Sequence, residues 1–230
     1  MRKFLWFLLP LALAACASPP REPASPAAPP AAASPAVPAE AGESWRVTGS
    51  HLAVRVYRDG PMQKLGHDHL VTSGSLAGEI RLREPLAASR FTLRLPLDSL
   101  VVDDAAERSR AGGVFAAPVP EKDREATRHN MLGERVLDAA RQAELVLTSE
   151  SISGGPADFE ARVRVSLAGT EHVLTVPFTA TVKDGQLVAH AVLHLTHADL
   201  GLQPFTVALG VLKVRDDFDV DLTVEAGRGT

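Results

Sequence analysis

The sequence predicts an all-β domain of about eight antiparallel strands with one short helical insertion. Apolar and polar residues alternate along many runs, most clearly from Phe159 to Leu167, as they do in strands with one buried face. Short turn signals, such as Lys183-Asp184-Gly185, separate the runs and indicate hairpins. Residues 121–143 break this pattern, because their apolar residues recur at helical spacing. Strands of this number and pattern form a sandwich or a closed barrel.

The strands are expected in chain order, each bounded by turn residues. The first ends at Asp59-Gly60-Pro61, and the third shows alternating apolar residues from Phe91 to Leu97. The turn Ser153-Gly154-Gly155-Pro156 separates the fourth from the fifth, and Ala168-Gly169-Thr170 separates the fifth from the sixth. The expected ranges are 45–57, 68–82, 90–102, 144–153, 158–168, 172–183, 186–197 and 205–225, the last of them broken.

The helical insertion lies between the third and fourth strands. It is rich in Glu, Arg, Ala and Leu, and forms one helix or two short ones. In a barrel, an insertion of this kind packs over an open end. Its apolar positions are Met131, Leu132, Val136, Leu137 and Ala140.

The interior of such a barrel is either filled by side chains or wide enough for one small ligand. The inward-facing candidates are Leu, Val, Ala and a few Phe, which suits an aliphatic lumen and a filled core equally well. Both interpretations remain open on this pattern. The residues expected at a cavity or its mouth are His67, His69, Leu93, Leu95, Val163, Val165, Val176, Phe178, Leu193 and His197.

Four motifs follow one another along the chain: Lys-Leu-Gly-His-Asp-His at 64–69, Leu-Asp-Ser-Leu-Val-Val-Asp at 97–103, Met131 with 136–141, and His-Ala-Asp-Leu-Gly-Leu at 197–202. With these motifs, the chain from Trp45 to Ala226, about 180 residues, resembles the YceI-like family of periplasmic polyisoprenoid-binding domains. The resemblance implies a lipocalin-like antiparallel barrel around an elongated apolar tunnel. It also implies a function, which is to bind an isoprenoid or a similar long-chain amphiphile.

The N-terminus predicts export and membrane anchoring. Residues 1–15 form a signal peptide, with basic Arg2 and Lys3 before a short apolar run. The sequence Leu13-Ala14-Ala15-Cys16 resembles a bacterial lipobox, in which Cys16 is acylated and becomes the new N-terminus. Residues 16–43 form a Pro- and Ala-rich tether, followed by the barrel domain at 44–226. By resemblance to bacterial lipoproteins, Ala17 favours the outer membrane, with the domain facing the periplasm.

His67 and His69 give an alternative function. On a strand they share one face, and a His-x-His pair supplies two ligands for Zn²⁺ or Cu²⁺, with His197 or Asp199 as a candidate third. The alternative protein would be a metal-binding or redox-accessory module. A structural role for His67 and His69 is favoured over metal binding, because histidine next to aspartate commonly forms a hydrogen-bonded pair. His190 and His194 are expected to face solvent, and His197 to point inward.

Several other classes are disfavoured. The formal charge is −4 and only 5% of residues are aromatic, so no nucleic-acid-binding surface is expected. One cysteine forms no internal disulfide and builds no multi-cysteine metal site. No Gly-x-Ser-x-Gly motif is present, and a paired-carboxylate hydrolase is disfavoured. A binding protein with no catalytic residues and no cofactor, apart from the bound lipid, is expected. A filled barrel acting as an envelope interaction domain is a third hypothesis.

Overall fold

The computed structural model describes residues 42–155, 158–207 and 210–229. The predicted signal peptide, Cys16 and all but the last two residues of the predicted tether lie outside these residues. Gly42 is followed directly by the first strand, which begins at Glu43.

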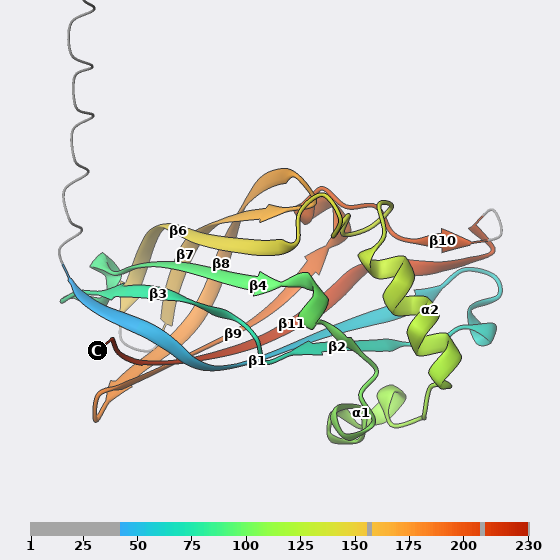
Figure 1. Cartoon of the computed structure of the whole chain (residues 1–230), viewed down its shortest axis with the longest axis horizontal. Coiled ribbons are helices and arrows are strands. Elements are labelled where there is room, and N and C mark those ends of the chain that lie inside the picture. Colours follow the sequence, from blue (N-terminus) through green and yellow to red (C-terminus); the bar gives the residue numbers. More distant parts are fainter. Residues whose placement is uncertain (1–41, 156–157, 208–209, 230) are drawn as a thin grey trace, which may run out of the picture. The chain divides into compact units, whose positions relative to one another are not determined.

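The described chain is a closed antiparallel β-barrel of eight strands (Figure 1). Around the barrel the order is β1, β3, β4, β6, β7, β8, β9 and β11, and β11 pairs with β1 to close it. The all-β prediction with a short helical insertion is therefore confirmed. The strands of the barrel are β1 Glu43–Asp59, β3 Ala77–Leu82, β4 Arg90–Pro96, β6 Glu144–Gly155, β7 Asp158–Leu167, β8 Thr170–Lys183, β9 Gln186–Thr196 and β11 Leu212–Arg228.

Three short strands extend this barrel at one end: β2 His69–Ser73, β5 Val101–Val102 and β10 Thr206–Val207. β2 and β3 correspond to the single strand predicted at 68–82, and both pair with β1 at different places along it. The strand predicted at 90–102 stops at Pro96, and β5 is its separated continuation. The break predicted in the last strand falls between β10 and β11.

Two predicted turns have the geometry that tight hairpins require. Ala168 and Gly169 connect β7 to β8, and Asp184 and Gly185 connect β8 to β9. All four residues have positive φ, between 51° and 77°. Two successive residues with positive φ are typical of the two-residue hairpin turns whose twist matches the strands. These turns fix the register of β7, β8 and β9, and hence which side chains face inward.

The two α-helices lie toward the same end of the barrel (Figure 1). Helix α2, Glu121–Leu132, lies in the predicted insertion, and turns continue from it to β6. Figure 1 shows α2 at the end of the barrel away from the start of β1. Helix α1, Ala105–Ala111, was not predicted from the sequence. Single 3-10 turns complete the structure: η1 Gln63–Leu65, η2 Leu86–Ala88, η3 Leu97–Ser99, η4 Gly113–Phe115 and η5 His197–Leu200.

Apolar residues pack at both ends of the barrel. Near the start of β1, Trp45 packs with Ile80, Leu187 and Ala226 and is 1% exposed. At the opposite end, Met131, Leu132 and Leu137 from α2 and the turn after it pack against the main core. Within the described residues, no helix has the length and apolar character needed to cross a membrane.

Candidate ligand-binding cavity

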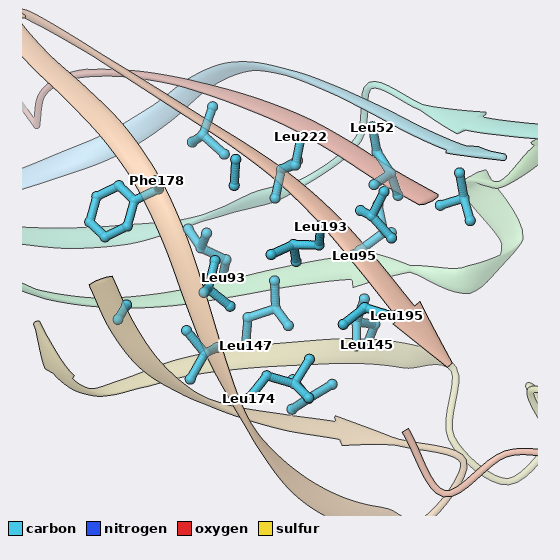
Figure 2. A pocket seen from close by; sticks show the side chains of 18 of the residues that line it. Leu52, Leu93, Leu95, Leu145, Leu147, Leu174, Phe178, Leu193, Leu195 and Leu222 are labelled. Atoms are coloured by element: carbon cyan, nitrogen blue, oxygen red, sulfur yellow. The ribbon is translucent and has the colours of Figure 1, made fainter. Parts of the chain in front are cut away.

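The barrel encloses a cavity of about 350 Å³. This volume is within the range of known small-molecule pockets. Figure 2 shows leucine side chains from several strands converging on it, with Phe178 at one side. Of the residues that line the cavity, all are apolar except Ser89, His190 and His197. The cavity therefore suits a hydrocarbon chain and offers few hydrogen-bonding groups.

Strand β9 runs along the full length of the cavity wall. Its alternate residues all line the cavity, because successive side chains of a strand point to opposite faces. From Leu187 in β9 to His197, the first residue of η5, the chain advances by ten residue steps, which corresponds to about 33 Å at the rise of a strand. These lining residues are Leu187, Ala189, Ala191, Leu193, Leu195 and His197.

Eight of the ten residues expected at a cavity or its mouth line this one. They come from β4, β7, β8, β9 and the start of η5, and Figure 2 labels four of them, Leu93, Leu95, Phe178 and Leu193. His67 and His69 are not among the lining residues. The eight are Leu93, Leu95, Val163, Val165, Val176, Phe178, Leu193 and His197.

The exposure of the lining residues indicates that the lumen is open. In a filled barrel the inward side chains would all be buried. Val163 and Val165 on β7 are buried, but Leu174, Phe178 and Leu193 keep intermediate exposure although they point into the cavity. The structure therefore does not support the filled-core interpretation.

The two ends of the cavity differ in their lining. Near the start of β7, the rings of Phe159 and Phe178 stack with centroids 5.3 Å apart. At the other end, the cavity wall includes Met131, Leu137, Leu202 and His197. The polar lining at this second end comes from a histidine.

His197 is buried in this wall, with its side chain 10% exposed. Its Nδ1 lies 2.6 Å from the main-chain oxygen of Asp216, and its ring meets the ring of Phe218 edge-on at 5.2 Å. A carbonyl oxygen only accepts, so Nδ1 carries the hydrogen of this bond. The ring is therefore held in one tautomer and one orientation.

His67 and His69 share one side of the chain, as their spacing predicts, and that side faces α2. His67 Nε2 lies 3.3 Å from Asp123 Oδ2, and His69 Nε2 lies 3.4 Å from Thr127 Oγ1. Asp123 and Thr127 are four residues apart, on one face of α2. The two histidines thus connect the helix to the entry of β2.

The main partner of His69 is Asp103, far away in sequence. His69 Nδ1 donates to Asp103 Oδ2 at 2.6 Å, and Asp103 Oδ1 accepts from the N–H of Leu70 at 2.9 Å and from Arg108 Nη1. Burial would raise the pKa of Asp103, but the bonds from His69, Leu70 and Arg108 outweigh it and lower that pKa. Arg108 also donates to the main-chain oxygens of Asp68 and Ala117.

Sequence reasoning missed this network for a simple reason. It considered Asp68 as the partner of the histidines because it is adjacent, whereas Asp68 Oδ1 accepts from the N–H of Arg58 at 3.0 Å. Asp103 and Arg108 come together with His69 only through the β2–β5 pairing and α1. The sequence held one signal for the start of α1, because aspartate is a good N-cap residue and Asp104 stands at that position. In the structure, Asp104 Oδ1 accepts from two N–H groups of α1.

The expected third metal ligands are not near the histidine pair. His197 follows β9, whereas His69 starts β2. Two strands, β11 and β1, lie between β9 and β2, which separates them by about 14 Å at the usual strand spacing. Asp199 Oδ2 accepts from the N–H of Thr196 at 2.7 Å within η5. Throughout the residues that the structure describes, no group of three or more His, Cys, Asp or Glu side chains is placed to hold a metal ion.

The outer face of β9 carries the two histidines that were expected in solvent. His190 Nε2 lies 3.0 Å from Asp221 Oδ1, and His194 Nδ1 lies 2.7 Å from Asp219 Oδ1. Both histidines are exposed. Asp219 also accepts from the hydroxyl of Tyr57 at 2.6 Å, and burial together with this bond raises the pKa of Tyr57 to about 12.

The structure defines a class of fold, an all-β, lipocalin-like antiparallel barrel with a short helical insertion. Among solved structures the chain is similar to BcnA of Burkholderia cenocepacia, at 10% identity and a TM-score of 0.54, over 76% of this chain and 95% of that one. The YceI protein of Campylobacter jejuni aligns at 11% identity and a TM-score of 0.48, over 68% and 82% of the two chains. At such identities the similarity to BcnA shows the fold alone. No family model and no curated protein matches the chain.

Proposed function

We propose that this protein binds one long-chain amphiphile, an isoprenoid or a similar lipid, with its hydrocarbon chain in the barrel lumen. The observation that carries the proposal is the open cavity of about 350 Å³, whose wall is apolar except for three residues. An apolar cavity open to water is poorly hydrated, and a hydrocarbon chain gains free energy by entering it. The role is binding, without catalysis.

The size of the gain is large enough for useful affinity. Each buried methylene contributes about 0.8 kcal/mol, so about ten of them contribute roughly 8 kcal/mol. That is the free energy of a micromolar complex, before the cost of ordering the chain is subtracted. Chains longer than about ten carbons are therefore the natural ligands of this lumen.

A lipid on Cys16 would hold the domain at the membrane that contains its ligand. The support is sequence evidence alone: a signal peptide at 1–15, the lipobox cysteine, and a Pro-rich tether from 16 to 43. In this proposal the domain faces the periplasm from the outer membrane. Cys16→Ser should abolish palmitate incorporation and release the protein from the membrane fraction; membrane retention of that variant without label would contradict the anchor.

Ligand binding is tested by filling the lumen. Leu193 points into the cavity from the middle of β9, so Leu193→Trp should weaken uptake of a C15 prenyl chain at least tenfold. Val192→Trp is the matched control, because Val192 is the next residue on the same strand and is 58% exposed on the outer face. Equal binding by both variants and the wild type would contradict binding in the lumen.

The metal-binding alternative has no supporting observation in the described residues. His67 and His69 contact Asp123, Asp103 and Thr127, and these contacts connect α2 and the segment before α1 to the barrel. Their arrangement fits a structural role.

A further inference from the structure

The polar groups in the cavity wall are not equivalent. The hydroxyl oxygen of Ser89 accepts from the N–H of Arg83 at 3.0 Å. The imidazole of His190 is exposed and bonds to Asp221 on the outer face. His197 is different, because its ring is buried and only one of its two nitrogens is bonded within the barrel wall.

The tautomer of His197 decides what the other nitrogen offers. Nδ1 carries the hydrogen that it donates to the oxygen of Asp216, so Nε2 of the neutral ring has a lone pair and acts as an acceptor. Within the described residues, Nε2 has no hydrogen-bond partner, and this atom is not fully buried. An acceptor left unpaired in an apolar cavity is unfavourable, and a ligand donor would satisfy it.

We infer that His197 Nε2 anchors the head group of the ligand by accepting a hydrogen bond from its hydroxyl. This inference rests on the proposed function and names the ligand class more closely: a long-chain alcohol, or a long-chain acid in its protonated form. The head group lies at the η5 end of the cavity, and the hydrocarbon chain runs along β9 toward Phe159 and Phe178.

The same wall disfavours a charged head group. No lysine or arginine is among the described residues that line the cavity, so the lumen supplies no cation for a pyrophosphate. A multiply charged group would have to lose its hydration without gaining ion pairs. The lumen therefore selects a small neutral head group over a large anionic one.

The test compares ligands that differ only in the head group. Farnesol donates a hydrogen bond, its methyl ether does not, and farnesyl pyrophosphate is charged, while all three have the same C15 chain. One neutral hydrogen bond corresponds to about a fivefold difference in Kd, so the full-length wild type should bind farnesol about fivefold more tightly than the ether. Palmitic acid and hexadecanol, measured together, distinguish an acid from an alcohol as the preferred source of the hydroxyl.

Three variants locate the effect. His197→Leu should bring the alcohol-to-ether ratio to about one, with the Kd of the ether changed by less than twofold. His197→Gln, which keeps an acceptor, should retain part of the preference. His194→Leu is the control, since His194 lies on the outer face of β9 and is 65% exposed, and its ratio should match the wild type.

The outcomes separate the two proposals. A wild-type ratio of one, an unchanged ratio in His197→Leu, or tighter binding of the pyrophosphate than of farnesol would overturn the role of His197 while leaving lumen binding in place. If none of the C15 ligands binds, the proposed function and this inference both fail. Because the comparison of ligands is made first on the wild type, it does not depend on the folding of any variant.

Discussion

Replacing Asp103 with alanine should destabilise the domain strongly. The carboxylate is fully buried and accepts hydrogen bonds from His69, from the N–H of Leu70 and from Arg108, whose own side chain is 4% exposed. Removing one partner of a buried ion pair costs about 3–5 kcal/mol, because the other charge stays buried without its partner. For a domain of this size, that lowers Tm by roughly 6–20 °C.

The measurement is urea unfolding followed by circular dichroism at neutral pH. Asp104→Ala is the matched control, since this neighbouring carboxylate only caps α1 and its loss should cost about 1 kcal/mol. The double variant Asp103→Leu/Arg108→Met should be less destabilised than the sum of the two single changes. A loss below about 1 kcal/mol for Asp103→Ala, or strict additivity in the double variant, would refute the network as described.

Acid should remove the same stabilisation. The pKa of Asp103 is lowered in the folded state, so its contribution is present above the pKa of the unfolded carboxyl, about 3.9. The contribution is lost as the pH falls below that value and through the lower folded pKa. The difference in stability between the wild type and Asp103→Asn should therefore shrink as the solution is acidified below about pH 4.

Three further predictions concern single features of the barrel. Tyr57 is the chain's one tyrosine and its pKa is raised to about 12, so an absorbance titration should show the phenol ionising near that pH, and ionisation near pH 10 would contradict this. The free energy of unfolding should fall between about pH 10 and 12, and Asp219→Asn should lower the pKa of Tyr57. Gly78→Ala should lower the free energy of unfolding by about 2–3 kcal/mol or more, because φ of Gly78 is 153° and a Cβ would lie 2.2 Å from a main-chain oxygen of β4. A free energy of unfolding equal to that of the wild type would show that β3 shifts to accommodate the Cβ. His67→Ala/His69→Ala should bind zinc as weakly as the wild type, whereas a tight wild-type site lost in the variant would restore the metal hypothesis.

The strands were predictable because local alternation and turn residues carry the information. The run from Phe159 to Leu167 is β7 almost residue for residue, and Asp184-Gly185 forms the expected two-residue turn. The eight residues expected in the lumen follow from the same alternation, since the register fixed by these turns decides which face is inward. Helix α1 escaped prediction because seven residues are too few for a helical period to stand out.

The candidate site needed more than local pattern. Alternation is the same for a filled and an open barrel, so the cavity depends on how eight strands close and on side-chain volumes across the lumen. The partner of His69 is 34 residues away, in a segment whose position is set by the pairing of β2 with β5. His197 was expected to point inward because it alternates with the apolar residues Leu193 and Leu195. Its hydrogen bond to the Asp216 carbonyl, however, depends on the pairing of β9 with β11.

Native mass spectrometry of the protein purified from its own host shows most directly whether the lumen holds a long-chain lipid. We expect one lipid per chain, seen as a mass adduct that organic extraction removes and that an added C15 prenyl chain restores. Repeated purifications that yield only the bare protein, together with no uptake of the added prenyl chain, would contradict it.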